Sequence, residues 1–120
     1  MKIVLVKNTT ISLTEQLYSQ IKSYALSRGG GEEKLPSIRS LAVELGVSVI
    51  TVKNAYELLQ NEGFISARQG SGVYLNALAP DLVSEVKTKI THKAKEILRE
   101  CKNSGVKKEQ LQKLIDELYD

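Results

Sequence analysis

The stretch 47-VSVITVKNAYELL-59 has the periodicity of a helix but carries β-branched apolar residues near its start. At about 100° per residue, two sides of such a helix can be separated. The side suited to a core holds Val52, Ala55, Tyr56 and Leu59. The other side holds Val49, Ile50, Lys53, Asn54 and Glu57. The pattern therefore predicts an amphipathic helix that turns two apolar residues outward, beside a lysine and an asparagine.

A second helix is predicted directly before this stretch. It starts after Ser37, a good N-cap residue, and ends at Gly46, which suits the left-handed conformation that closes many helices. Ser48 can then cap the next helix, which runs to about Asn61. Two helices joined by a three-residue turn that contains glycine are the sequence form of a helix-turn-helix.

Two short strands are predicted next, at residues 64–67 and 73–75, on either side of the glycine-rich tip 68-RQGSG-72. A hairpin directly after the second helix of such a unit is a wing. Before the unit, residues 1–11 are predicted to be extended and residues 14–28 to be helical. The sequence up to residue 79 thus predicts a winged helix-turn-helix.

The last forty residues predict two more helices, which start at Pro80 and after the break 103-NSG-105. Their apolar residues recur at steps of three and four, and a single helix cannot bury such a face by itself. The face either folds back on the winged helix or pairs with a second copy of the chain. The lysines and the arginine between residues 87 and 99 are expected to form a solvated face.

The composition indicates an ordinary globular chain of 120 residues, 42% hydrophobic and 26% charged, with a net charge of +3. This charge favours an anionic partner only weakly. One Cys and one His cannot form a disulfide framework or a multi-ligand zinc site, and a lone thiol fits a reducing compartment. No apolar run has the length of a signal peptide or a membrane span, so a cytoplasmic location is predicted.

A helix-turn-helix places its second helix in the DNA major groove, where the first residues of that helix reach the base edges. There Val49 and Ile50 are placed to contact the thymine methyl group, Asn54 suits adenine, and Lys53 suits guanine or a phosphate. For Val49, packing under the wing or against the preceding helix is an equally good interpretation. Ile50 is expected to be exposed.

Phosphate contacts are predicted at two other places. Ser37 and Arg39 lie at a helix N-terminus, which favours anions, although Ser37 can equally be a simple cap and Arg39 a solvated charge. Arg68 and the glycines of the hairpin tip suit a close approach to phosphate or to a narrow minor groove. A glycine-containing tip is also a common structural turn, so its position after the second helix favours the functional interpretation.

The run 36-PSIRSLAVELGVSVITVKNAYELLQNEGFISARQGSGVYL-75 closely resembles the winged helix-turn-helix of GntR-type bacterial transcription regulators. It matches their pattern P-S-x-R-x-L-A-x-x-L-G-V-S, followed by T-V, A-Y, E-G and G-x-G at fixed spacing. The short tail is similar to that of the YtrA-like subgroup, in which it is a helical dimerisation segment. The resemblance covers residues 12–75.

This resemblance implies a mostly α fold with a small β-wing, in which residues 1–79 form the DNA-binding domain and residues 80–120 a two-helix dimerisation tail. It implies a homodimeric regulator, a repressor, that binds a palindromic operator in double-stranded DNA. With the two groove-facing apolar residues included, the expected DNA contacts are Ser37, Arg39, Ser48, Val49, Ile50, Thr51, Lys53, Asn54, Arg68, Gln69, Gly70 and Gly72. The expected dimer contacts are Val83, Val86, Ile90, Ile97, Leu111, Leu114, Ile115 and Leu118.

The sequence departs from the family pattern at two places. Many members have Arg where this chain has Val49, which shifts the expected base preference toward A·T. The loop 28–34 is glycine-rich and looks shorter than usual, which weakens the expectation of the short strand that the family has there.

Two other classes of function fit the sequence less well. A winged helix can also serve as a protein-interaction or RNA-binding module, and the outward Val49 and Ile50 would suit a protein contact. An enzyme is not predicted, because the sequence has no paired His and Cys, and the G-S-G at the hairpin tip lacks the lysine of a phosphate-binding loop. No cofactor or metal is predicted. The sequence identifies neither the operator nor an effector, for which the junction of tail and winged helix would be the expected place.

Overall fold

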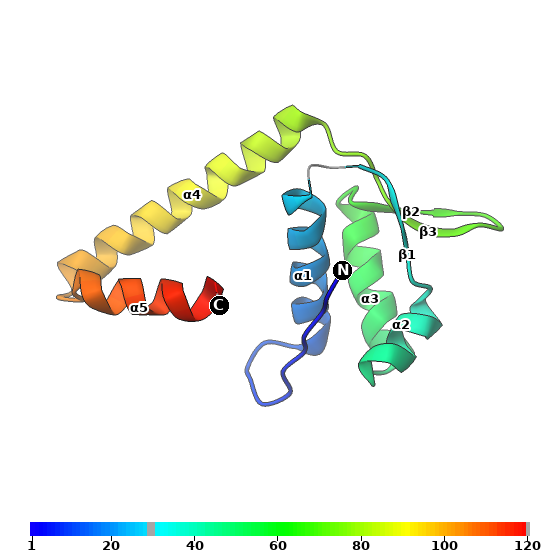
Figure 1. The fold of residues 1–120 in the computed structure, drawn as a ribbon, viewed down its shortest axis with the longest axis horizontal. Coiled ribbons are helices and arrows are strands. Elements are labelled where there is room, and N and C mark those ends of the chain that lie inside the picture. The colour runs from blue at the N-terminus through cyan, green and yellow to red at the C-terminus, as the bar shows by residue number, and fades with distance from the viewer. Residues whose placement is uncertain (29–30, 120) are drawn as a thin grey trace. The chain divides into compact units, whose positions relative to one another are not determined.

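The computed structural model describes residues 1–28 and 31–119, which form two compact units, Met1–Val83 and Ser84–Asp120 (Figure 1). The first unit contains α1 (Leu13–Ser27), β1 (Glu33–Leu35), α2 (Ile38–Leu45), α3 (Val49–Asn61), β2 (Ile65–Arg68) and β3 (Gly72–Leu75). Helix α4 (Pro80–Asn103) begins in the first unit and continues into the second, which also contains α5 (Lys108–Tyr119). The predicted fold class, mostly α with a small β-sheet, is confirmed.

Serine caps begin the first three helices. The Oγ atoms of Ser12, Ser37 and Ser48 each accept the backbone N–H three residues later at 3.1 Å, as N-caps do. Helix α2 ends at Gly46, whose φ of 67° and ψ of 35° are left-handed. The N–H of Val47 then donates to the carbonyl of Ala42 at 3.0 Å. The predicted helix, glycine turn and second helix are therefore all present.

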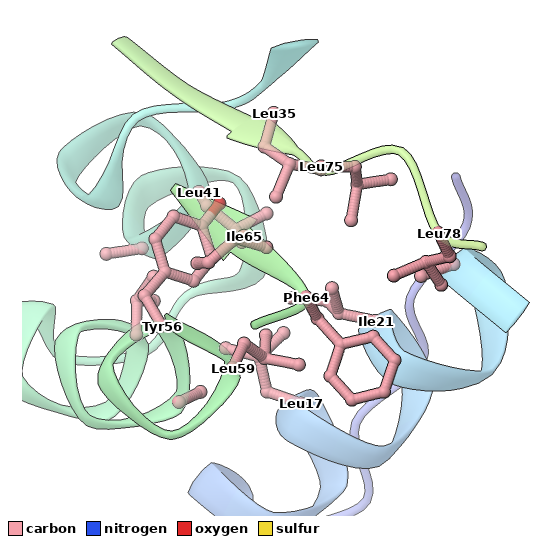
Figure 2. Close-up of a cluster of buried hydrophobic side chains, with 14 of the residues drawn as sticks. Leu17, Ile21, Leu35, Leu41, Tyr56, Leu59, Phe64, Ile65, Leu75 and Leu78 are labelled. Carbon is pink, nitrogen blue, oxygen red and sulfur yellow. The ribbon is translucent and has the colours of Figure 1, made fainter. Parts of the chain in front are cut away.

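Helix α3 is the centre of the first unit, since both α1 and α2 pack against it. The side predicted to face the core does so: Val52, Ala55 and Leu59 have no exposed surface, and Tyr56 is 3% exposed. Figure 2 shows Tyr56 and Leu59 in one cluster with Leu17 and Ile21 of α1. Burial of a full leucine, isoleucine or valine side chain contributes about 1.5–3 kcal/mol, so this side of α3 fixes the orientation of the helix.

The three strands form one antiparallel sheet in the order β1-β3-β2. Its inner face carries Leu35, Ile65 and Leu75, which are all buried in the same cluster (Figure 2). The hairpin begins and ends near the predicted residues, although β2 starts after Phe64, a buried residue whose N–H donates to the carbonyl of Leu59 at 2.9 Å.

The short strand β1 corrects the weakened expectation for the loop 28–34. Leu35 is only 3% exposed and pairs with Val73 of β3, so burial of one side chain and pairing with the hairpin hold the strand in place. Of this glycine-rich loop, residues 29 and 30 lie outside the described part of the chain.

Two glutamines of α1 hold the extended N-terminal segment. The Gln20 side chain donates to the carbonyl of Val4 at 2.6 Å and accepts the Val4 N–H at 2.9 Å. Gln16 makes the same pair of hydrogen bonds with Val6, both at 2.8 Å. Ile3 and Leu5 pack against the core. A side-chain amide thus replaces a neighbouring strand for this segment.

Val83 differs from the prediction that placed it in a dimer interface. Its side chain is 8% exposed and belongs to the core cluster of the first unit. The first unit therefore extends to Val83, past the predicted boundary at residue 79. The periodicity placed Val83 on an apolar face correctly, but that part of the face is covered by the same chain.

The second unit keeps most of its apolar residues at the surface. At the end of α4 the N–H of Val106 donates to the carbonyl of Cys101 at 2.9 Å, and Gly105 adopts a φ of 85°. Val86 and Leu111 are half-buried. The exposed apolar residues predicted for the dimer interface are Ile90, Ile97, Leu114, Ile115 and Leu118. Across residues 1–28 and 31–119, no helix has both the length and the hydrophobicity to cross a bilayer.

Val83→Ala in the full chain should lower the free energy of unfolding of the first unit by about 1–2 kcal/mol, since two buried methyl groups are lost. Leu82→Ala is the matched control, because Leu82 is 45% exposed, and it should cost less than half as much. Urea unfolding measures both. An unchanged stability together with a shift from dimer to monomer would return Val83 to the interface between copies.

Candidate nucleic-acid interface

The outer side of α3 carries the residues predicted to contact bases. Ile50 is 61% exposed and Val49 is 43% exposed, and Lys53 and Asn54 are exposed as well. Neither Val49 nor Ile50 is part of the core. Val49 is therefore not packed internally, which was the alternative interpretation of this residue. These four side chains lie on one side of the helix, opposite the residues in contact with α1.

Hydroxyl groups hold the N-terminus of α3. The Oγ of Ser48 lies 2.9 Å from the Oγ1 of Thr51, besides accepting its N–H. Thr14 of α1 donates its hydroxyl to the carbonyl of Thr51 at 3.4 Å. Ser48 is exposed and Thr51 is half-buried. The first turn of α3 is thus tied to α1, and Ser48 is the more accessible of the two predicted contacts.

A buried tyrosine positions the start of α2. The hydroxyl of Tyr56 on α3 donates to the carbonyl of Pro36 at 2.7 Å, directly before the cap residue Ser37. Burial raises the pKa of Tyr56 to about 12 because the charged phenolate is poorly solvated there. Ser37 and Arg39 are both exposed. Through this hydrogen bond, α3 fixes the position of the α2 N-terminus, which carries both predicted phosphate contacts.

The tip of the wing is a tight turn between β2 and β3. The N–H of Ser71 donates to the carbonyl of Arg68 at 3.0 Å, and Gly70 and Gly72 adopt φ values of 75° and 131°. Residues with such angles are rarely other than glycine. Gln69 and both glycines are exposed, so the backbone of the tip is open to a ligand.

The base of the wing is fixed by Asn76, which the sequence analysis missed. Its side chain donates to the carbonyl of Gly63 at 2.9 Å and accepts the hydroxyl of Ser66 at 2.7 Å. Its backbone N–H donates to the carbonyl of Phe64 at 2.9 Å. No sequence pattern pointed to Asn76, because its role depends on the pairing of β2 with β3.

Lys34 of β1 is a second residue that the sequence analysis missed. A Cβ atom built on Gly72 would lie 3.1 Å from the Cε of Lys34, so this side chain crosses over the wing at that glycine. A shallow depression of about 330 Å³ is lined by Lys34, Ser37, Arg39 and Gly72, among others. The structure therefore brings β1, the start of α2 and the wing together. A strand at this position would have predicted that Lys34 is exposed because the neighbouring Leu35 is buried, but the loop sequence offered little reason to expect the strand.

The cations of the first unit fall into two groups, those with and those without an ion-pair partner. Three cations form ion pairs: Lys22 with Glu62, Arg28 with Glu33, and Arg68 with Glu32. Within the described ranges, Lys34, Arg39 and Lys53 have no ion-pair partner. All three are exposed. These three cations lie on β1, α2 and α3 and can each take a phosphate, although α2 and α3 also carry the exposed Glu44 and Glu57.

The second unit holds the only His and Cys of the chain. The Nε2 of His92 lies 3.1 Å from the Oε1 of Glu96, one turn along α4, and Cys101 is half-buried. In the part of the chain that the structure describes, no three His, Cys, Asp or Glu residues are grouped as a metal site would need.

Comparison with known proteins gives one family. Residues 12–75 match the profile of the family described as "Bacterial regulatory proteins, gntR family". The repressor YtrA of Bacillus subtilis is 33% identical over 108 residues, which span 87% of this chain and 82% of YtrA. The regulatory protein MocR of Rhizobium meliloti is 34% identical over 68% of this chain, but the match spans only 17% of MocR.

Two solved structures extend the comparison. A protein described as a transcriptional antiterminator from Listeria monocytogenes EGD-e has a TM-score of 0.69 and 27% identity over 100% of this chain and 91% of its own. The DNA-binding domain of AraR, solved in complex with operator ORX1, has a TM-score of 0.53 and 20% identity over 62% of this chain and 95% of its own. At that identity the second likeness concerns the fold alone.

Tyr56→Phe should lower the free energy of unfolding by about 1 kcal/mol at pH 7, because the carbonyl of Pro36 loses its donor. The pKa of Tyr56 is raised from 10.0 to about 12 in the fold. The preference of the fold for the neutral phenol therefore adds to the free energy of unfolding, and this contribution is complete below pH 10. It is lost as the pH rises from 10 through 12, by at most about 1.4 kcal/mol per pH unit.

Urea unfolding of both proteins between pH 7 and pH 12 measures this difference. The advantage of the native chain over Tyr56→Phe should shrink above pH 10. Tyr119→Phe, at a tyrosine that is 88% exposed, is the control and should follow the native chain at every pH. Parallel curves for the native chain and Tyr56→Phe would show that burial of this hydroxyl does not perturb its titration.

Proposed function

Because the chain belongs to the GntR family of DNA-binding transcription regulators, we propose that it is a repressor which binds a palindromic operator as a homodimer. Helix α3 lies in the major groove in this proposal, and the wing contacts the adjacent backbone or minor groove. The family consists of transcription regulators rather than enzymes. A cytoplasmic location follows from this role and from the single thiol of the chain.

The observation that carries the proposal is the outer side of α3. Its exposed Val49 and Ile50 match the apolar methyl group of thymine, and Asn54 can donate to and accept from an adenine edge. Lys53 can donate to guanine or to a phosphate. An exposed mixture of apolar and hydrogen-bonding groups on one helix face suits a groove that presents both kinds of atom.

Phosphate contacts are assigned to the elements beside α3. The Ser37 oxygen accepts an N–H as a cap, which leaves its own O–H free to donate to a phosphate. Arg39 and Lys34 add charge beside the same depression. The wing adds Arg68 together with Gln69, Gly70 and Gly72. Such contacts fix the register of the protein on the duplex without reading its sequence.

The dimer is assigned to the second unit. Exposed apolar residues recur along α4 and α5, and among them Ile90, Ile97 and Leu118 are 59%, 58% and 82% exposed. Without Val83, the proposed dimer contacts are Val86, Ile90, Ile97, Leu111, Leu114, Ile115 and Leu118. A two-fold dimer would present two copies of α3 to half-sites about one helical turn apart. A compact dimer over a promoter would block polymerase, which supports the assignment as a repressor.

The runner-up is a winged helix that binds another protein or RNA, and outward Val49 and Ile50 are what favours it. DNA binding through phosphates predicts an affinity that falls steeply with salt, whereas a protein contact through apolar groups predicts little salt dependence. Selection of bound sequences from random duplex DNA separates these functions. An inverted repeat is expected; recovery of no motif at low salt, together with salt-independent binding of another partner, would favour the runner-up.

Lys53→Ala should weaken binding to the selected operator about 10- to 100-fold per half-site, the range for loss of one good base contact, and leave the fold unchanged. Lys113→Ala on α5 removes the same charge from an exposed position and should change operator affinity by less than twofold. Fluorescence anisotropy at fixed salt measures both. Native affinity in Lys53→Ala would show that the outer side of α3 does not contact DNA.

Ile97→Glu combined with Leu118→Glu should convert the dimer to a monomer, since two charges would be buried in the proposed apolar interface. The monomer should bind the operator weakly because it reaches only one half-site. Thr88→Glu, at an exposed position on the polar side of α4, is the control and should remain dimeric. Sedimentation equilibrium gives the oligomeric state, and a dimeric double variant would move the interface away from these helices.

A further inference from the structure

Arg68 differs from the other exposed cations of the proposed DNA surface, because its guanidinium already forms an ion pair with an acidic side chain. Its Nη2 lies 2.9 Å from the Oε1 of Glu32. Its Cζ lies 4.1 Å from the centre of the Tyr74 ring, and the Tyr74 hydroxyl is hydrogen-bonded to Ser71 at 2.5 Å. The guanidinium is thus stacked on one side and paired with a carboxylate at its edge.

The register of the sheet explains why these residues meet. Arg68 of β2 is directly opposite Gly72 of β3, which has no side chain, so the guanidinium can lie diagonally across to Tyr74. Glu32 directly precedes β1, the strand on the other side of β3. The pair therefore joins two segments that are far apart in the sequence, across the outer face of the sheet.

We propose that Glu32 competes with DNA for the wing arginine Arg68, and so sets the affinity of the wing for any duplex. The proposal rests on the proposed function. A carboxylate and a phosphate both accept hydrogen bonds from a guanidinium in the same planar geometry. While Glu32 holds Nη2, a phosphate oxygen has to displace it, and the displaced carboxylate then stands close to the negatively charged backbone.

The exposure of the pair makes this exchange possible. The side chains of Arg68 and Glu32 are 43% and 57% exposed, so neither is locked in the core and an exposed pair of this kind is weak. Tyr74 keeps the guanidinium in place by stacking when Glu32 leaves. In contrast, Lys34, Arg39 and Lys53 have no ion-pair partner among the described residues and can bind phosphate without an exchange.

The neighbouring Glu33 provides a matched control. Its carboxylate accepts the hydroxyl of Tyr24 at 2.7 and 2.9 Å and lies 3.4 Å from the Nη2 of Arg28. It is one residue away from Glu32 and carries the same charge, but its carboxylate contacts Tyr24 of α1 and Arg28, which directly follows α1, rather than the wing. Glu33→Gln therefore changes the net charge near the wing without releasing Arg68.

Glu32→Gln should increase affinity about two- to fivefold per wing, the range that corresponds to one exposed ion pair. The increase should be the same for operator and for random duplex, because phosphate contacts are independent of sequence. The slope of log affinity against log salt should become more negative by up to about 0.9 per wing. Fluorescence anisotropy with both duplexes at several salt concentrations measures these changes in the full chain.

Arg68→Gln tests whether the effect passes through the arginine. In that background Glu32→Gln should gain little, and in the native background Glu33→Gln should gain less than Glu32→Gln. Equal gains from Glu32→Gln with and without Arg68 would overturn the proposal in favour of a general charge effect. Weaker binding in Glu32→Gln would overturn it too, since Glu32 would then position Arg68 for DNA. If the native chain itself binds no duplex, the proposed function fails, whereas native binding unaffected by Glu32→Gln refutes this inference alone.

Discussion

The burial of one side of α3 is the constraint on which the rest of the first unit depends. Val52, Ala55 and Leu59 have no exposed surface, so a rotation of the helix by one position would expose them and bury Lys53. Burying an unpaired lysine costs far more than any single surface contact can return. The orientation of Val49, Ile50, Lys53 and Asn54 is therefore set by packing on the opposite side of the helix, and the outer side chains need no contacts of their own to stay in place.

Packing and hydrogen bonds in the first unit also hold α2, β1 and the hairpin in place beside α3. Tyr56 holds the start of α2 through the carbonyl of Pro36, and Leu35 holds β1 and hence Lys34 beside the wing. Asn76 closes the base of the hairpin. The proposed phosphate contacts Lys34 and Ser37 thus each lie directly beside a residue that is buried or hydrogen-bonded to the core. Exposed charged groups on rigid supports lose little conformational freedom on binding, which is the physical advantage of this arrangement.

The sequence predicted the features that are decided locally, the hairpin included, and missed those that depend on contacts between segments far apart in the sequence. Both faces of α3, the caps at Ser37 and Ser48 and the left-handed Gly46 follow from residue type and helical period. The strand β1 does not, because a three-residue strand exists only through its register with β3. The period of α4 placed Val83 on an apolar face but could not show which chain covers it. The pair Glu32–Arg68 joins residues 36 positions apart, and it follows from sheet register rather than from a motif.

The two units differ in how their apolar residues are buried. This difference decides how strongly a weak ion pair at the wing can change DNA affinity. The first unit covers its core with its own side chains, whereas α4 and α5 leave Ile97 and Leu118 exposed. If a second copy covers them, each complex contains two wings, and a factor that applies at each wing applies twice to the affinity of the whole. A fivefold effect at one exposed ion pair then becomes roughly 25-fold for the dimer. A surface pair such as Glu32–Arg68, too weak to matter for the fold, is in that case strong enough to tune binding.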